Sequence, residues 1–217
     1  MHRTRDGSEI VTCELPEAGF LNDLIEYKGY LYVTDSKVNQ FFVFDAKLLV
    51  HGKCEYSTIP FPYDGFSGDG FPYSNGIEIY KGGLIISTIG GALPVVIIEM
   101  AQFWYVGLVT GEASPMISGA IGDGLLVDGD IFYAGDPLNS VSGIYELDCG
   151  KMSGVTATKL DESTLDLFVG PSTVTQYKDW LYALNLVRTF TARSFQPLSS
   201  NVWLLTYLHT LFYRALV

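Results

Sequence analysis

The sequence predicts an all-β fold, a β-propeller, on three grounds: a repeat, its spacing and the lack of long helical patterns. The stretch NDLIEYKGYLYVTDS begins at Asn22, and related stretches begin at Asn75, Asp123 and Ser172. Each copy has a small or polar pair, an apolar strand, a turn such as Lys-Gly and a second apolar strand. We find no convincing long amphipathic helix between residues 1 and 186. Periods of ~40–50 residues made of short strands are typical of propeller blades.

Two further strands are expected to complete each repeat. QFFVFDA and YSTIPFP follow the first copy, and SGIYELDC and VTATKL follow the third. Four antiparallel strands make one blade. We interpret SEIVTCEL, which precedes Asn22, as an outer strand left from a preceding blade. A plain β-sandwich with chance similarity between hairpins is the alternative, and the near-constant spacing of four copies favours the propeller.

The repeats define one domain, a partial propeller over residues 1–186 with about four blades plus an outer strand. A divergent apolar tail follows at 187–217, and it has no Asp, Glu, Lys or Gly. We interpret this tail first as mispredicted sequence and second as a docking helix over 201–217. The segment PVVIIEMAQFW, residues 94–104, is equally foreign to the repeat and is interpreted in the same way.

Composition and charge restrict the partners of this protein. The chain has 217 residues and is 48% hydrophobic, so it can form a substantial core. Thirteen Lys and Arg against 24 Asp and Glu give a net charge of −11. Nucleic acids and anionic membrane surfaces repel such a chain, which excludes both as expected partners. A small-molecule substrate remains the expected partner.

A long apolar run, residues 92–109, raises the question of a membrane span. The run contains Pro94, Glu99 and Gln102. A membrane helix would place Glu99 near the centre of the bilayer, at a cost of about 2.5–3.5 kcal/mol on the insertion scale. We therefore predict a buried strand pair and no membrane span.

The cysteines and histidines do not form a metal-binding pattern. The chain has three residues of each type, and no Cys-x-x-Cys occurs, so a structural zinc site is not expected. The odd number of cysteines argues against a complete disulfide framework, which leaves the redox compartment open. The first residues lack the apolar region of a signal peptide. Localisation is thus unknown, with secreted and cytoplasmic both open.

The polar residue that opens each repeat has a predicted position at the rim of a central channel, just before the innermost strand of its blade. Asn22, Asn75 and Asp123 would then converge on the axis and offer two amide oxygens and one carboxylate. These are hard oxygen donors, suited to Ca²⁺, Mg²⁺ or Mn²⁺. A lone Asn before a strand is usually a turn residue, but three donors in register favour a metal site.

Four stretches resemble one family. FLNDLIEYKGYLYVTDS, SNGIEIYKGGLIIST and GDGLLVDGDIFYAGD resemble the SMP-30/gluconolactonase/luciferin-regenerating-enzyme family of six-bladed β-propellers, and GPSTVTQYKDWLYALN is similar to its closing repeat. The resemblance covers roughly residues 8–185.

The resemblance implies one divalent metal at the channel mouth, usually Ca²⁺ or Zn²⁺. Carried over, Asn22, Asn75 and Asp123 match three of the family's ligands. The metal would polarise a lactone or ester carbonyl, and Asp123 would also activate the attacking water. Asp23 would lie beside the substrate. The implied function is a metal-dependent lactonase or esterase-type hydrolase.

Two departures from the family keep other functions open. The repeat that supplies the family's Glu ligand is absent, and Glu9, Glu14 and Glu17 lack its sequence setting, so that ligand is not assigned. Four repeats are also fewer than six blades. An incomplete ring exposes strand edges and favours self-association. The alternatives are therefore a non-catalytic propeller that binds a ligand or protein, or an inactive truncated family member.

Overall fold

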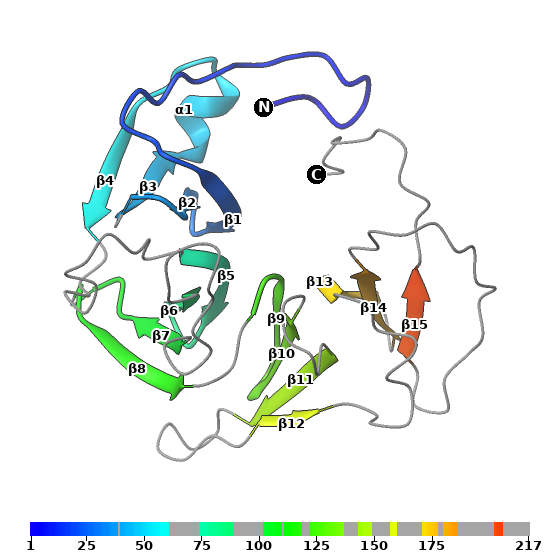
Figure 1. Cartoon of the computed structure of the whole chain (residues 1–217). Helices are drawn as coiled ribbons and strands as arrows, with labels where there is room; N and C mark the ends of the chain where they lie inside the picture. Colours follow the sequence, from blue (N-terminus) through cyan, green and yellow to red (C-terminus); the bar gives the residue numbers. More distant parts are fainter. Residues whose placement is uncertain are drawn as a thin grey trace.

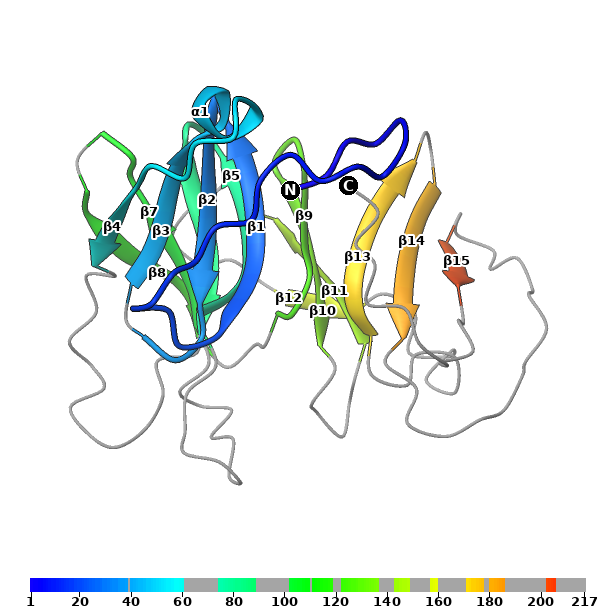
Figure 2. The ribbon, with the colours of Figure 1, turned by 90° about the horizontal axis from the view of Figure 1, so that it is seen from above.

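The protein is built almost wholly of β-strands. The computed structural model describes residues 1–38, 40–60, 74–88, 102–109, 111–118, 122–136, 143–148, 157–159, 171–177, 180–185 and 202–205. These residues form four sheets that lie in sequence order along an arc around a common centre (Figure 1). Figure 2, turned by 90° from Figure 1, shows the strands lengthwise, so Figure 1 looks roughly along the strands. The all-β prediction is confirmed.

The first two sheets have four antiparallel strands each, in chain order. The first sheet consists of β1 (Leu21–Tyr27), β2 (Tyr30–Asp35), β3 (Gln40–Asp45) and β4 (Tyr56–Pro60), with the short helix α1 (Ala46–Val50) between its last two strands. The second sheet consists of β5 (Ser74–Tyr80), β6 (Gly83–Thr88), β7 (Gln102–Val106) and β8 (Ala113–Ser118). In Figure 1 the first strand of each sheet lies nearest the centre of the arc.

The third and fourth sheets continue the series. The third consists of β9 (Leu125–Asp128), β10 (Ile131–Asp136), β11 (Gly143–Asp148) and β12 (Ala157–Lys159). The fourth consists of β13 (Pro171–Tyr177), β14 (Trp180–Asn185) and β15 (Val202–Leu205). The strands that the sequence predicted after the first and third copies are therefore present.

The turns of the first two repeats have a backbone that matches the twist of a hairpin. Lys28 and Gly29 have φ values of 52° and 84°, and Lys81 and Gly82 have values of 45° and 81°. Positive φ at both central residues defines the two-residue turn that joins antiparallel strands without splaying them. Each lysine also lies over the ring of the preceding tyrosine, at 4.9 Å and 4.8 Å from the ring centre.

The core lies between neighbouring sheets, because alternate side chains of a strand point to opposite faces. The first and second sheets bury Tyr32, Phe41, Ile77, Leu84, Ile86 and Trp104 between them. The second and third sheets bury Tyr80, Ile85, Phe103, Leu125 and Phe132. The first three sheets are thus fixed against one another by apolar layers.

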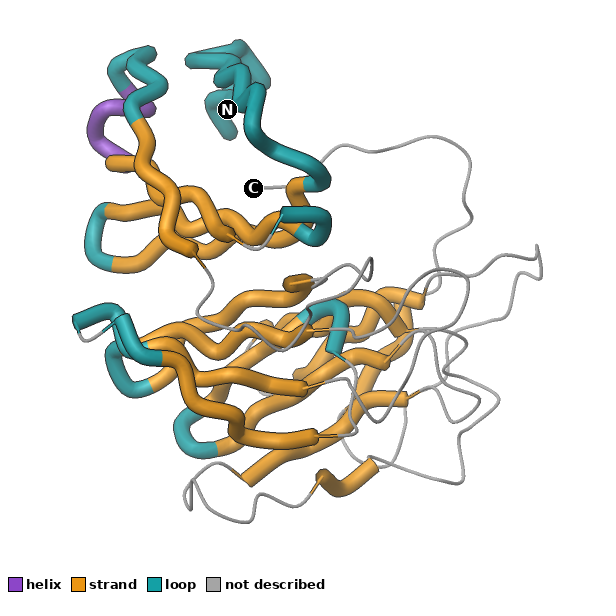
Figure 3. The backbone as a smooth tube through the Cα atoms, turned by 60° about the vertical axis from the view of Figure 1, so that its left-hand side comes forward, coloured by secondary structure: helices purple, strands orange, loops and turns teal. Residues whose placement is uncertain are grey.

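The N-terminal segment, residues 1–20, covers the other face of the first sheet (Figure 3). Val11 packs with Val33, Phe42 and Phe44, and a disulfide joins Cys13 to Cys54 beside this layer. The prediction of a strand at SEIVTCEL is wrong, since these residues form only an isolated bridge between Glu9 and His2. Their apolar side chains are buried on the face of the sheet instead of extending an edge.

Two segments interpreted as foreign to the fold contribute strands. Residues 102–104 begin β7, and Phe103 is fully buried, so the end of the 94–104 segment is part of the second sheet. Val202–Leu205 form β15, parallel to β14, which contradicts a helix at those four positions. The rest of both segments lies outside the described residues. Within the part of the chain that is described, no helix is long and apolar enough to cross a membrane.

Candidate functional site

The opening pairs of the first two repeats lie in β-bulges on the central side of the arc. The pairing of β1 with β2 shifts between Leu21 and Leu24, and that of β5 with β6 shifts between Ser74 and Ile77. Asn22 and Asn75 therefore lie inside the first strands of their sheets, not just before them as predicted. A bulge re-aims side chains that a regular strand would send to alternate faces.

Hydrogen bonds join the bulge of the first sheet to that of the second. The backbone amide of Asp23 donates to Oγ1 of Thr34 at 3.0 Å, and this hydroxyl donates to the carbonyl oxygen of Asn75 at 2.7 Å. The amide of Ile77 donates to Oδ2 of Asp23 at 3.1 Å. This bond holds the carboxylate of Asp23 against β5, at a residue that follows Asn75 by two positions in the sequence.

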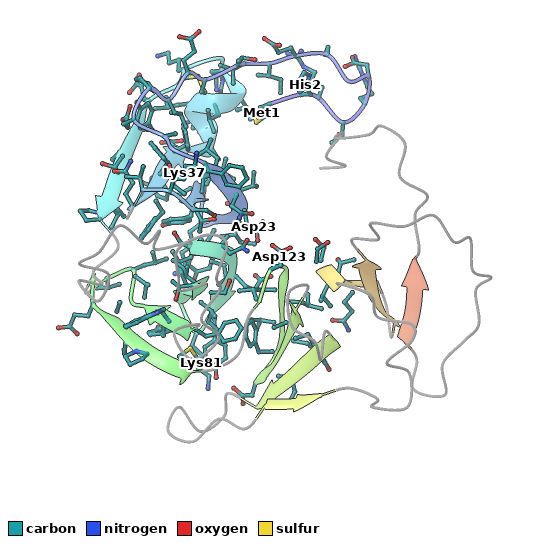
Figure 4. The ribbon with its side chains drawn as sticks, in the orientation of Figure 1. Met1, His2, Asp23, Lys37, Lys81 and Asp123 are labelled. Carbon is teal, nitrogen blue, oxygen red and sulfur yellow. A yellow bond between two sulfur atoms is a disulfide. The ribbon has the colours of Figure 1, made fainter. Side chains whose placement is uncertain are left out.

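The third sheet meets the same bulge from the opposite side. Gly76 has no side chain, and a Cβ there would overlap the carbonyl oxygen of Asp123. The side chain of Asn75 lies near the carboxylate of Asp123 and lowers its pKa, against the effect of burial. Ser87 donates to the carbonyl oxygen of Gly122, next to Asp123. The structure therefore brings Asp23, Asn75 and Asp123 together around Gly76, and Figure 4 shows the two aspartates near each other at the centre of the arc.

One oxygen atom of this group has no hydrogen-bond partner. Asn75 is only 7% exposed, and its Oδ1 is buried without a hydrogen bond. An unsatisfied buried polar atom costs about 1–3 kcal/mol, and such atoms in native structures call for an explanation. A cation beside this oxygen is one explanation that the neighbouring carboxylates support.

The carboxylates of the site are poorly solvated. Burial raises the pKa of Asp123 to about 6, with the charge of Asp23 adding to the rise and the Asn75 side chain opposing it. Burial also raises the pKa of Asp23, against hydrogen bonds from the amides of Ile77 and Leu24. Both groups therefore lie where a negative charge is disfavoured unless a cation is nearby.

Glu78 is a third carboxylate of this region, and the sequence analysis missed it. It lies on β5, and its Oε1 accepts a hydrogen bond from the amide of Ile79 at 2.8 Å. Burial raises the pKa of Glu78, and the charge of Asp23 adds to the rise. The available signal was a Glu between two isoleucines in an otherwise apolar strand. Among the described residues, Asp23, Glu78 and Asp123 form no ion pair with Lys or Arg.

Asn22 is placed differently from the other predicted site residues. Its side chain is exposed, and its Nδ2 donates to Oγ of Ser36 at 2.9 Å. No hydrogen bond between described residues joins Asn22 to Asn75 or Asp123. Within the same residues, no three His, Cys, Asp or Glu side chains are grouped closely enough to hold a metal. A cation here would need the amide oxygen of Asn75 as well as the carboxylates.

No family model matches the chain, and no curated protein matches it.

Proposed function

We propose that this protein is a metal-dependent hydrolase of lactone-like or ester-like small molecules, on a partial six-bladed propeller of the SMP-30/gluconolactonase type. The observation that carries the proposal is the buried, unpartnered Oδ1 of Asn75 beside the carboxylate of Asp123. The arc of sheets, each with its first strand toward the centre, supports the architecture.

The residues present fit a hard divalent cation. The amide oxygen of Asn75 and the carboxylates of Asp123 and Asp23 are oxygen donors, and Ca²⁺ prefers a set of this kind, with Mg²⁺ and Mn²⁺ next. Zn²⁺ is less favoured because no His or Cys joins the group among the described residues. When bound, the cation would act as a Lewis acid on a lactone or ester carbonyl.

Asp123 has the features of the proton acceptor in this reaction. Its carboxylate lies near the side chain of Asn75, where it would hold the cation and accept a proton from an attacking water. That proton would pass to the alcohol oxygen released when the ester bond breaks. Glycine at position 76 lets the third sheet approach, so it fixes the distance between Asp123 and Asn75.

Hydrolysis assays on the purified full chain test this function. The substrates are a panel of five- and six-membered lactones and aryl esters, assayed with Ca²⁺, Mn²⁺ or a chelator. We expect activity that the chelator abolishes and that Asp123→Asn reduces at least 100-fold. Cation binding without hydrolysis of any substrate would favour the alternative, a non-catalytic binding module. Absence of cation binding would overturn the proposed site altogether.

A further inference from the structure

Asp23 differs from the residues at the same position of the second and third repeats. When the copies are aligned on Asn22, Asn75 and Asp123, the next residue is Asp23 in the first copy but glycine, Gly76 and Gly124, in the others. At both glycines an added Cβ would collide with the backbone of the following sheet. In the first copy this position instead carries a carboxylate that extends to the following sheet.

The carboxylate of Asp23 is fixed in place but not saturated. Its Oδ1 accepts from the amide of Leu24 at 2.8 Å, and its Oδ2 accepts from the amide of Ile77 at 3.1 Å. An ionised carboxylate offers about four acceptor sites, so one site on each oxygen remains. Two backbone donors orient the group, which lowers the entropy that a ligand would have to remove from it.

Asp23 and Asp123 approach the Asn75–Ile77 bulge from opposite sides. Asp23 reaches it from β1 through the amide of Ile77, and Asp123 packs on Gly76 from the start of the third sheet. The two charges interact, and in the described residues no Lys or Arg neutralises them. The unpartnered Oδ1 of Asn75, on a residue 7% exposed, belongs to the side chain that lowers the pKa of Asp123.

We infer that Asp23 is a direct ligand of the cation, as the second carboxylate of a site completed by Asp123 and Oδ1 of Asn75. The inference rests on the proposed function for the presence of a cation, but it assigns the ligands differently from the sequence analysis. Asn22 is left out of this ligand set, because its side chain is exposed and its Nδ2 is bonded to Ser36 of its own sheet. Two carboxylates also neutralise a divalent charge without a Glu from another repeat.

The test is cation binding by the purified full chain, measured by calorimetry with Ca²⁺ and by electron paramagnetic resonance with Mn²⁺. Asp23→Asn removes the charge while its amide oxygen still accepts from Ile77. We expect it to weaken binding at least 10-fold. Asn22→Ala is expected to leave binding within 3-fold of the wild type. Glu78→Gln is the matched control, because it removes one nearby negative charge from a residue that is not a ligand.

The outcomes separate the inference from the proposed function. Equal losses in Asp23→Asn and Glu78→Gln, or a larger loss in Asn22→Ala, would overturn the role of Asp23 while leaving a cation site. Binding that requires Asp23 but supports no hydrolysis would uphold the inference and overturn the proposed function. No binding by the wild type would overturn both. If Asp23→Asn fails to fold, Asp23→Gly replaces it, since glycine occupies this position in two other repeats.

Discussion

The hydroxyl of Thr34 donates a 2.7 Å hydrogen bond to the backbone carbonyl oxygen of Asn75, and both residues are buried. Thr34 lies on β2 and Asn75 on β5, so the bond crosses from the first sheet to the second. The same hydroxyl accepts from the amide of Asp23. One side chain therefore sets the positions of two residues of the candidate site.

Thr34→Val tests this connection. Valine has nearly the shape of threonine but leaves the amide of Asp23 and the carbonyl oxygen of Asn75 without their partner. We expect a loss of about 1–3 kcal/mol in the free energy of unfolding, the usual cost of unsatisfied buried groups. Urea denaturation measures it. The control is Thr58→Val on the exposed side of β4, which should change stability by less than about 0.5 kcal/mol.

The sequence alone predicts the first two strands of each repeat, because the copies share length and pattern. It does not predict the bulges, since a register shift depends on which groups of the neighbouring sheet are available to bond. In a bulge two successive residues can exchange directions, so the sequence does not decide which of Asn22 and Asp23 faces the second sheet. Glu78 was missed because one charged residue in an apolar strand carries no spacing signal.

The N-terminal segment shows a second limit. The alternation of SEIVTCEL is as compatible with a segment lying on a sheet as with a strand. Its burial in the structure is set by the apolar outer face of the first sheet and by the bond between Cys13 and Cys54. Three cysteines allow three pairings, and nothing in their spacing selects this one.

The disulfide provides a test of that arrangement. The bond closes a loop between residues 41 apart in sequence, and loops of this length give roughly 2–4 kcal/mol on closure. Cys13→Ser with Cys54→Ser should lower stability by that amount and increase the binding of a hydrophobic dye to the uncovered face. Reductant should have the same effect on the wild type. A further loss on reducing the double variant would contradict the assignment.

The pH dependence of stability should carry the signature of Asp123. Its pKa is raised from 3.8 to about 6, so between these values the folded protein binds more protons than the unfolded chain. Stability of the cation-free protein therefore falls as pH rises from about 4 to 6, and the reduced level persists above that window. The fall attributable to Asp123 is about 1–3 kcal/mol.

Asp123→Asn should remove this component. The variant, compared with the wild type in chelator at pH 4 and pH 7, is expected to have a flatter profile and to be the more stable of the two at pH 7. Denaturation at both pH values measures the difference. Parallel profiles for the two proteins would show that Asp123 titrates normally. With saturating Ca²⁺ the order at pH 7 should reverse, because only the wild type gains binding energy.

Gly76→Ala should uncouple the second and third sheets. The added methyl group would overlap the carbonyl oxygen of Asp123, which is backbone and cannot rotate away. Relief requires the third sheet to move, so we expect a loss of about 2–4 kcal/mol in stability, as for other overpacked or strained sites. The same movement would separate Asp123 from Asn75, so cation affinity should fall at least 10-fold.

Gly29→Ala is the matched control, because Gly29 has a φ of 84° but open space around it. It should cost only about 1 kcal/mol of backbone strain and leave cation binding intact. Equal effects of the two substitutions on binding would show that the approach of Asp123 to Gly76 does not position the site.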